Sequence, residues 1–106
     1  MTVKYKNAKV DLTTTNATAV LTPANATTAV IKSILASEDS GNADTITLTI
    51  TSGSDVFSLF KVKAVGANAT VELLTAPLVL AESEILKATA ATANRLHVVV
   101  SYMEIS

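Results

Sequence analysis

The sequence predicts an all-β fold: an antiparallel β-sandwich, jelly-roll or immunoglobulin-like, of about seven or eight short strands. Segments with alternating apolar and polar residues recur along the chain, and turn-forming residues separate them. No strand alternates with a long helical pattern, which argues against a parallel sheet. The 106 residues contain no linker-like stretch, so residues 1–106 are expected to form one domain.

Two short strands are expected near the N-terminus. The first is Thr2–Lys6, with an extension toward Leu12, although residues 1–10 are also compatible with an extended arm. The second covers Ala17–Thr22, and the turn residues Pro23 to Asn25 end it.

The clearest strand is Asp44–Thr51, where isoleucine and leucine alternate with threonine. This period of two predicts one buried face and one face that is wet or covered by a partner. Thr27–Ser37 is partly apolar on both faces, as in a central strand. The loop Glu38–Ala43 between them contains the turn pair Gly41-Asn42, so the two strands are predicted to form a hairpin.

Two further strands are expected at Val56–Val65 and Ala69–Leu74, after a turn at Thr51–Asp55. Strict alternation places Phe57 and Phe60 on opposite faces of the first. One of these two rings is therefore expected in the core, and the other is a candidate for contact with a partner.

The segment Ala76–Asn94 allows two interpretations. Its alanine, leucine, glutamate and lysine residues are good helix formers. Pro77 and the Glu82-Ser83 pair divide it instead into two short strands around a turn. The strand-rich surroundings favour the second interpretation, with a single helical turn near Ala81–Glu84 left open.

The last strand is Leu96–Ser106, which contains the only histidine of the chain, His97. Alternation puts His97 and Glu104 on opposite faces, so they cannot form a dyad within the strand. Ser101 shares the face of His97 but lies about 13 Å along the strand. Because histidine catalysis needs a partner within about 3 Å, His97 is expected to be a surface or subunit-contact residue.

Two other groups could carry chemistry but are interpreted as turns. Glu82 and Glu84 would share a strand face, as paired glycosidase carboxylates can, but the chain has few aromatic residues to line a sugar cleft. The loop Glu38–Asp44 offers oxygen ligands for calcium, but it lacks the spacing of an EF-hand and a closing bidentate glutamate.

Composition excludes several classes of function. The net charge is −1, there are three glycines and no cysteine, and no basic stripe occurs. These features disfavour nucleic-acid binding, a phosphate-binding loop and a thiolate metal site, and no apolar run is long enough to span a membrane. No cofactor is expected and the chain is predicted not to be an enzyme. Only 16% of residues are charged, which favours a protein packed into an assembly, although a threonine-rich β-domain without partners also fits.

The run DLTTTNATAVLTPANATTAVIKSILASEDSGNADTITLTI resembles small virion proteins of tailed bacteriophages. It follows their order of a strand, a proline-containing turn, an apolar strand, a Ser/Asn/Gly loop and a threonine-rich strand. The ending LVLAESEILKATAATANRLHVVVSYMEIS is similar to the last hairpin of these proteins, with Ser101-Tyr102-Met103-Glu104 as its closing pattern. The resemblance covers roughly Asp11 to Ser106.

This resemblance implies a non-enzymatic β-sandwich subunit of a phage particle, assembled in the bacterial cytoplasm. The leading hypothesis that it implies is a capsid decoration or cement protein, which binds the major capsid protein and forms homo-oligomers, with trimers favoured. A neck, collar or tail-attachment subunit is the alternative, and a carbohydrate-binding module is an alternative of another class. The residues predicted to lie at contacts are Val3, Tyr5, Phe57 and Tyr102.

Overall fold

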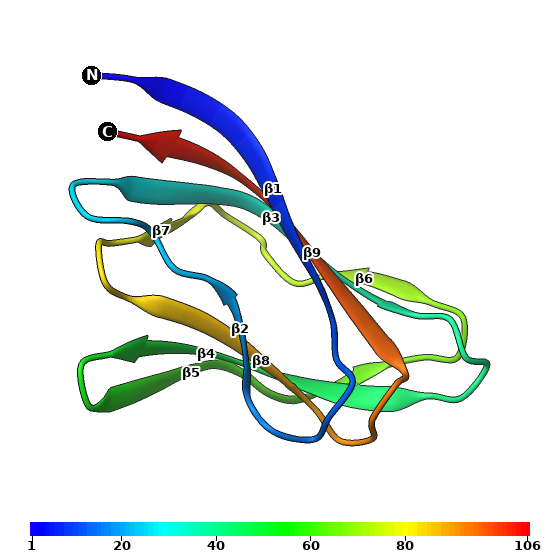
Figure 1. Ribbon diagram of the computed structural model, residues 1–106. Coiled ribbons are helices and arrows are strands. Elements are labelled where there is room, and N and C mark those ends of the chain that lie inside the picture. The colour runs from blue at the N-terminus through cyan, green and yellow to red at the C-terminus, as the bar shows by residue number, and fades with distance from the viewer.

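The computed structural model describes residues 1–106 as nine antiparallel strands in two packed sheets, without a helix (Figure 1). The all-β prediction is confirmed, with nine strands where about seven or eight were expected. The strands are β1 (Val3–Asp11), β2 (Thr18–Leu21), β3 (Thr28–Glu38), β4 (Asp44–Ser52), β5 (Asp55–Val65), β6 (Thr70–Glu72), β7 (Leu78–Leu80), β8 (Ile85–Ala90) and β9 (Leu96–Ile105).

The strand pairs are nested, as in one long hairpin that has been rolled up. β4 pairs with β5, β3 with β6 and β7, β2 with β8, and β1 with β9. Additional pairing of β3 with β9 and of β4 with β8 closes the roll. This arrangement is the jelly roll, which decides between the two sandwich types that the sequence left open.

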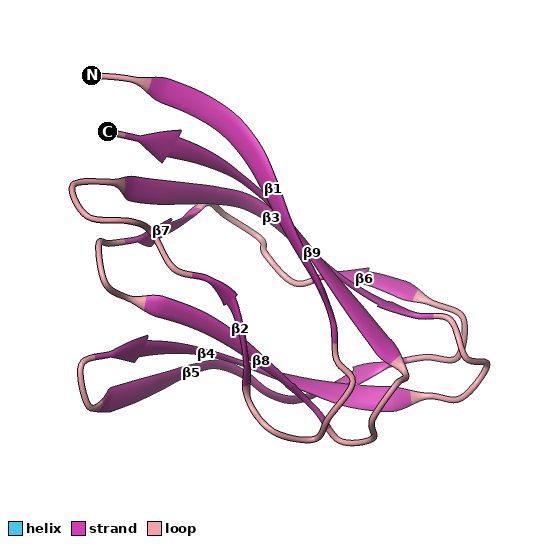
Figure 2. Cartoon of the chain, in the orientation of Figure 1, coloured by secondary structure: helices cyan, strands magenta, loops and turns pink.

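The roll produces two sheets, which we call sheet A and sheet B (Figure 2). Sheet A has the order β1-β9-β3, and β6 and β7 share the far edge of β3. Between β6 and β7 the Glu72 carboxylate replaces a strand partner, accepting the Ile34 N–H at 2.8 Å. Sheet B has the order β2-β8-β4-β5.

The core lies between the sheets and follows the period of two. In β4 the aliphatic residues Ile46, Leu48 and Ile50 point inward, and the alternating threonines point outward, as predicted. The same alternation holds in β8 and in the first half of β9. The buried apolar residues are Leu12, Ala29, Ile31, Ile34, Ala36, Ile46, Leu48, Ile50, Val65, Leu73, Leu80, Leu86, Ala88, Ala90, Leu96, Val98 and Val100.

The predicted hairpin of β3 with β4 is wrong. β3 lies in sheet A and β4 in sheet B, so the loop 39–43 crosses from one sheet to the other. The edges of β3 are occupied by β9 on one side and by β6 and β7 on the other. β4 instead pairs with β5 through the tight turn at 53–54. A loop of this length can span the ~10 Å between packed sheets, so loop length alone did not require a hairpin.

The N-terminal segment is a strand of sheet A along its whole length. All nine residues of β1 pair with β9 without a register shift, from Val3 opposite Ile105 to Asp11 opposite His97. Residues 3–10 therefore do not form the extended arm that the sequence left open. The extension of the first strand toward Leu12 is confirmed.

The segment 76–94 forms two strands around a turn, so the strand interpretation is confirmed. β7 and β8 flank the turn 81–84, where the Glu84 carboxylate accepts the Ala81 N–H at 2.8 Å. No helical turn forms there.

The strict alternation predicted for β5 is interrupted by irregularities. Its register with β4 shifts twice, between Ile46 and Leu48 and between Leu48 and Thr49. As a result both Leu59 and Phe60 pack against the core, whereas Phe57 is exposed. Of the two rings, Phe60 is therefore the one that packs against the core, and Phe57 is the exposed one, whose contact with a partner stays a prediction.

Candidate functional site

The two ends of the sandwich differ, and each holds a candidate site. At the turn end, the loops 12–17, 39–43, 66–69 and 91–95 come together (Figures 1 and 2). At the open end lie both chain termini, the connections 22–27 and 81–84, and the tip of the β4–β5 hairpin.

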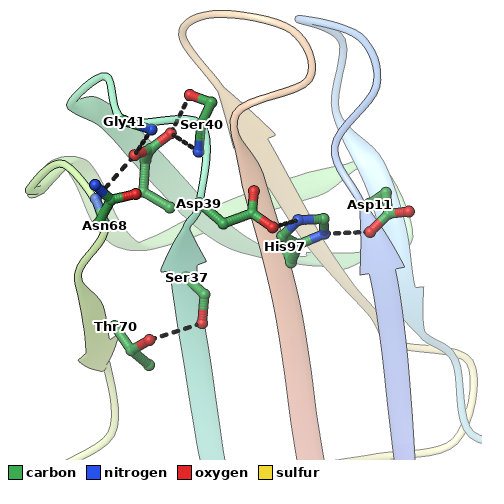
Figure 3. Close-up of polar contacts among 9 residues, drawn as sticks. Asp11, Ser37, Asp39, Ser40, Gly41, Asn68, Thr70 and His97 are labelled. Atoms are coloured by element: carbon green, nitrogen blue, oxygen red, sulfur yellow. Dashed lines mark hydrogen bonds and ion pairs between the residues drawn. The ribbon is translucent and has the colours of Figure 1, made fainter.

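At the turn end, His97 bridges two carboxylates (Figure 3). Its Nδ1 contacts Asp11, the last residue of β1, and its Nε2 lies 2.9 Å from an oxygen of Asp39 in the loop after β3. The imidazole therefore links β1, β9 and the β3–β4 loop. Both partners lie outside the strand of His97, which is why alternation within that strand did not identify them.

This geometry favours the protonated imidazole. A neutral histidine can donate through only one ring nitrogen, whereas the imidazolium donates through both. The contact with Asp11 raises the pKa of His97, and the hydrogen bond to Asp39 adds to it, although partial burial acts in the opposite sense. The side chain remains 40% exposed, so solvent weakens the ion pairs.

The cluster is not arranged as a catalytic triad. Ser37 stands opposite His97 in the β3–β9 register, but its hydroxyl lies 3.0 Å from the Thr70 hydroxyl instead (Figure 3). Both ring nitrogens of His97 already contact carboxylates, so neither is free to take a proton from a nucleophile. The arrangement therefore fits a structural role, in which His97 links the ends of β1 and β9 to the β3–β4 loop. We call these two contacts the His97 tie.

Glu38 holds the neighbouring loops together. Its buried carboxylate accepts the N–H groups of Ser40 at 2.9 Å, Gly41 at 3.1 Å and Asn68 at 3.0 Å, and also the Ser40 hydroxyl. Desolvation raises the pKa of Glu38, but the Ser40 hydroxyl and the three N–H donors outweigh it and lower the pKa to about 2. One carboxylate thus connects the loops 39–43 and 66–69.

The carboxylates of the segment 38–44 point to different partners. Glu38 binds backbone N–H groups, Asp39 contacts His97, and Asp44 accepts the Thr92 N–H at 3.1 Å. No group of three acidic, histidine or cysteine side chains is placed to hold a metal ion. The interpretation of this segment as a turn agrees with these contacts.

At the open end, the four predicted contact residues lie on different surfaces. Val3 and Tyr5 are on the outer face of sheet A and are 43% and 80% exposed. Phe57 is 57% exposed but belongs to sheet B. Tyr102 has the opposite orientation to Tyr5 and packs against the core.

Val3 and Tyr5 belong to a larger patch that crosses sheet A. Cross-strand partners share a face, and the register places Val3 beside Ile105 and Tyr5 beside Met103. Met103 in turn lies beside Val30, and Val30 beside Val79, which is 58% exposed. We call this patch the outer apolar band; its members are Val3, Tyr5, Val30, Val79, Met103 and Ile105.

Sequence reasoning found two members of the band and missed the rest. Val30, Val79, Met103 and Ile105 come from three strands that are far apart in the chain. Each strand has apolar residues on both faces, which was visible in the sequence for β3 and β9. The order of the strands, which brings these second faces together, was not.

No described protein family, curated protein or solved structure matches this chain. The structure also contains no helix that is long and apolar enough to cross a membrane.

Proposed function

We propose that this chain is a non-enzymatic structural subunit of a tailed-bacteriophage particle, which binds the capsid shell as a decoration or cement protein. The observation that carries this proposal is the outer apolar band, in which apolar residues of four strands adjoin one another on the outer face of sheet A. Contiguous exposed apolar residues with a polar rim typically mark sites of protein interaction. The band is unpartnered within the chain.

Two further features support this proposal. The jelly roll is common among capsid proteins, although it also occurs in lectins and cupins. The fold therefore supports the proposal by analogy only. Both ring nitrogens of the one histidine contact carboxylates, and the hydroxyl of the neighbouring Ser37 contacts Thr70 instead, which favours a structural role. A carbohydrate-binding module would need an aromatic platform, and the exposed rings of Tyr5 and Phe57 are on different sheets.

In the proposed mechanism, the band is buried against the major capsid protein. A stable interface buries about 1,200–2,000 Å² in total, so the band would form the apolar centre of a larger contact. The low charge of the chain means that few ions need to be desolvated when this surface is covered. Binding to the assembled shell and not to its dissociated subunits would stabilise the shell by mass action.

The test is to purify the particles of the phage that carries this gene and to count copies of the chain by quantitative mass spectrometry. The expected result is a number comparable with that of the major capsid protein. If only a few copies per particle are found, the decoration role is rejected in favour of a neck, collar or tail-attachment role. Absence of the chain from purified particles would reject the whole proposal.

A matched pair of variants tests the surface itself. Particles that lack the chain are mixed with purified protein and then sedimented, and the bound fraction is measured. Tyr5→Ser combined with Val79→Ser is expected to lower binding at least tenfold. Phe57→Ser, which removes from sheet B an apolar side chain about as exposed as Val79, is expected to bind like the wild type.

A further inference from the structure

The free edge of β1 presents unpaired backbone groups. Thr2 and Ser106 exchange two hydrogen bonds of 2.7 and 2.9 Å, and the Leu12 N–H donates to Leu96 at 2.9 Å. These bonds fix the phase of the ladder, so the even-numbered residues of β1 bond to β9. The N–H and C=O groups of the odd-numbered residues point away from the sheet; these residues are Val3, Tyr5, Asn7 and Lys9.

The other sheet edges are protected against pairing, as edge strands usually are. β2 has four residues and an irregular register, and β6 and β7 have three residues each. β5 is long, but its register shifts twice and Val62 has a left-handed φ of 56°. β1 alone is both long, with nine residues, and regular.

The charges on β1 restrict how a second copy of this strand could pair with it. Lysines on an edge strand commonly oppose pairing, and β1 carries Lys4, Lys6 and Lys9. When a second β1 is laid antiparallel with its two-fold axis at Asn7, Lys4 faces Val10, Lys6 faces Ala8 and Lys9 faces Tyr5. No lysine then faces a lysine. Moving the axis to Tyr5 or Lys6 places lysines opposite one another, which is unfavourable.

The register centred on Asn7 also uses the whole strand. Every residue from Val3 to Asp11 then has a partner, and the outward-facing backbone groups of the odd-numbered residues meet their counterparts. The Lys9 ammonium of each copy lies opposite the Tyr5 ring of the other, a favourable cation–π pair. β1 thus matches a second copy of itself in length and hydrogen-bonding phase, without placing lysines directly opposite one another.

We propose that two copies of this chain associate through antiparallel pairing of their β1 strands about Asn7, which joins the two copies of sheet A into one continuous sheet. The association is two-fold, in contrast to the trimer implied by the resemblance to phage proteins. It closes after two copies because the far edge of sheet A is short and interrupted. It does not depend on the proposed function, because it concerns only contacts between copies.

Cysteine cross-linking tests both the partner and the register, since the chain has no cysteine of its own. In Asn7→Cys the two introduced residues meet on the two-fold axis with Cα atoms about 5.5 Å apart, within reach of a disulfide. In Val3→Cys the two introduced residues are about 27 Å apart, from eight residues at ~3.4 Å each.

The expected result under mild oxidation is a covalent dimer of Asn7→Cys formed at least tenfold faster than that of Val3→Cys. A mixture of Val3→Cys with Asp11→Cys is expected to cross-link, because these two positions face each other across the pair. Ser58→Cys, at an exposed position of β5, is the control for random collisions. The proposal is overturned if Asn7→Cys cross-links no faster than Ser58→Cys.

Sedimentation gives a second measurement that does not depend on cysteine. The wild-type chain is expected to reach twice its 11.0 kDa mass as concentration rises. Asn7→Lys puts two ammonium groups face to face on the axis and is expected to stay monomeric, whereas Ser58→Lys is expected to dimerise normally. Circular dichroism confirms that both variants are folded. A wild type that stays monomeric or forms trimers, or an Asn7→Lys variant that dimerises normally, rejects the proposal.

Discussion

The two ends of this sandwich are built differently. At the turn end, buried or paired carboxylates hold four loops together: Glu38 and Asp44 accept backbone N–H groups, and Asp11 and Asp39 contact His97. At the open end, large apolar side chains stand in solvent, among them Val3, Tyr5, Phe57 and Val79.

This difference indicates that the turn end stabilises the fold, whereas the open end offers a surface to a partner. Polar groups that satisfy one another within the chain have little left to offer a partner, so the turn end is suited to holding the fold. Exposed apolar groups contribute little to the monomer but gain free energy when a partner covers them. We therefore expect substitutions at the turn end to change the free energy of unfolding, and substitutions at the open end to change association.

Among the polar contacts that distinguish the two ends, the largest expected effect is that of Glu38→Ala, which leaves three backbone N–H donors without their acceptor. We expect Tm to fall by roughly 10 °C. The matched variant is Glu104→Ala, which breaks the exposed 3.1 Å ion pair with Lys6 at the open end and should cost less than about 1 kcal/mol. Differential scanning calorimetry checks both, and equal losses of Tm would remove the distinction between the ends.

Acid should destabilise the turn end next most strongly. The pKa of Glu38 is lowered from 4.5 to about 2, so its contribution to stability is complete above pH 4.5 and is lost as pH falls toward 2. Desolvation raises the pKa of Glu72, at the edge of sheet A, but the Ser33 hydroxyl and nearby N–H groups outweigh it and lower that pKa. Protonation of Glu72 in acid therefore also destabilises the fold. Urea midpoints across this range should fall in the wild type and fall less in Glu38→Gln.

A smaller effect of opposite sign is expected from His97. Its pKa is raised above 6.5, so the tie is complete below pH 6.5 and weakens as pH rises through the folded-state pKa. Since the groups are exposed, the change should be below about 1 kcal/mol. Urea unfolding between pH 6 and 9 should show this slope in the wild type and in Asp55→Asn, an exposed control, but not in His97→Gln. A slope that persists in His97→Gln would assign it to another group.

The smallest expected effect is that of Val79→Thr, which keeps the β-branched shape and changes only an exposed side chain of the outer apolar band. The free energy of unfolding of the monomer should stay within about 0.5 kcal/mol of the wild type. Its neighbour Leu80 is fully buried, and Leu80→Ala should cost about 2–5 kcal/mol. Urea unfolding of dilute protein measures both. A large loss in Val79→Thr would mean that the band serves the fold of the monomer.

Local patterns predicted which residues form strands and which of their faces are buried. The threonine alternation of β4 correctly predicted its inward isoleucine and leucine residues, because side-chain direction in a strand repeats every two residues. The same rule correctly separated His97 from Glu104. It was less accurate for β5, where register shifts place Leu59 and Phe60 together against the core.

The candidate site was predicted only in part. Tyr5 and Val3 stood out because aromatic and β-branched residues alternate with lysine in β1. The partners of His97 did not stand out, because Asp11 and Asp39 are brought to it from 86 and 58 residues away in the chain. The hairpin expected between β3 and β4 was wrong for the same reason, since the competing partners of β3 come from distant strands.

By itself, therefore, the sequence determined the strands, most turns and the inward or outward direction of most side chains. These properties follow from the local period of two and from turn chemistry. Only the tertiary structure decided the order of the strands, and with it the jelly roll, the His97 tie, the outer apolar band and the free edge of β1. Strand order depends on which strands of the whole chain pair edge to edge. Because such pairing joins residues far apart in the chain, it produces no local periodic pattern in the sequence.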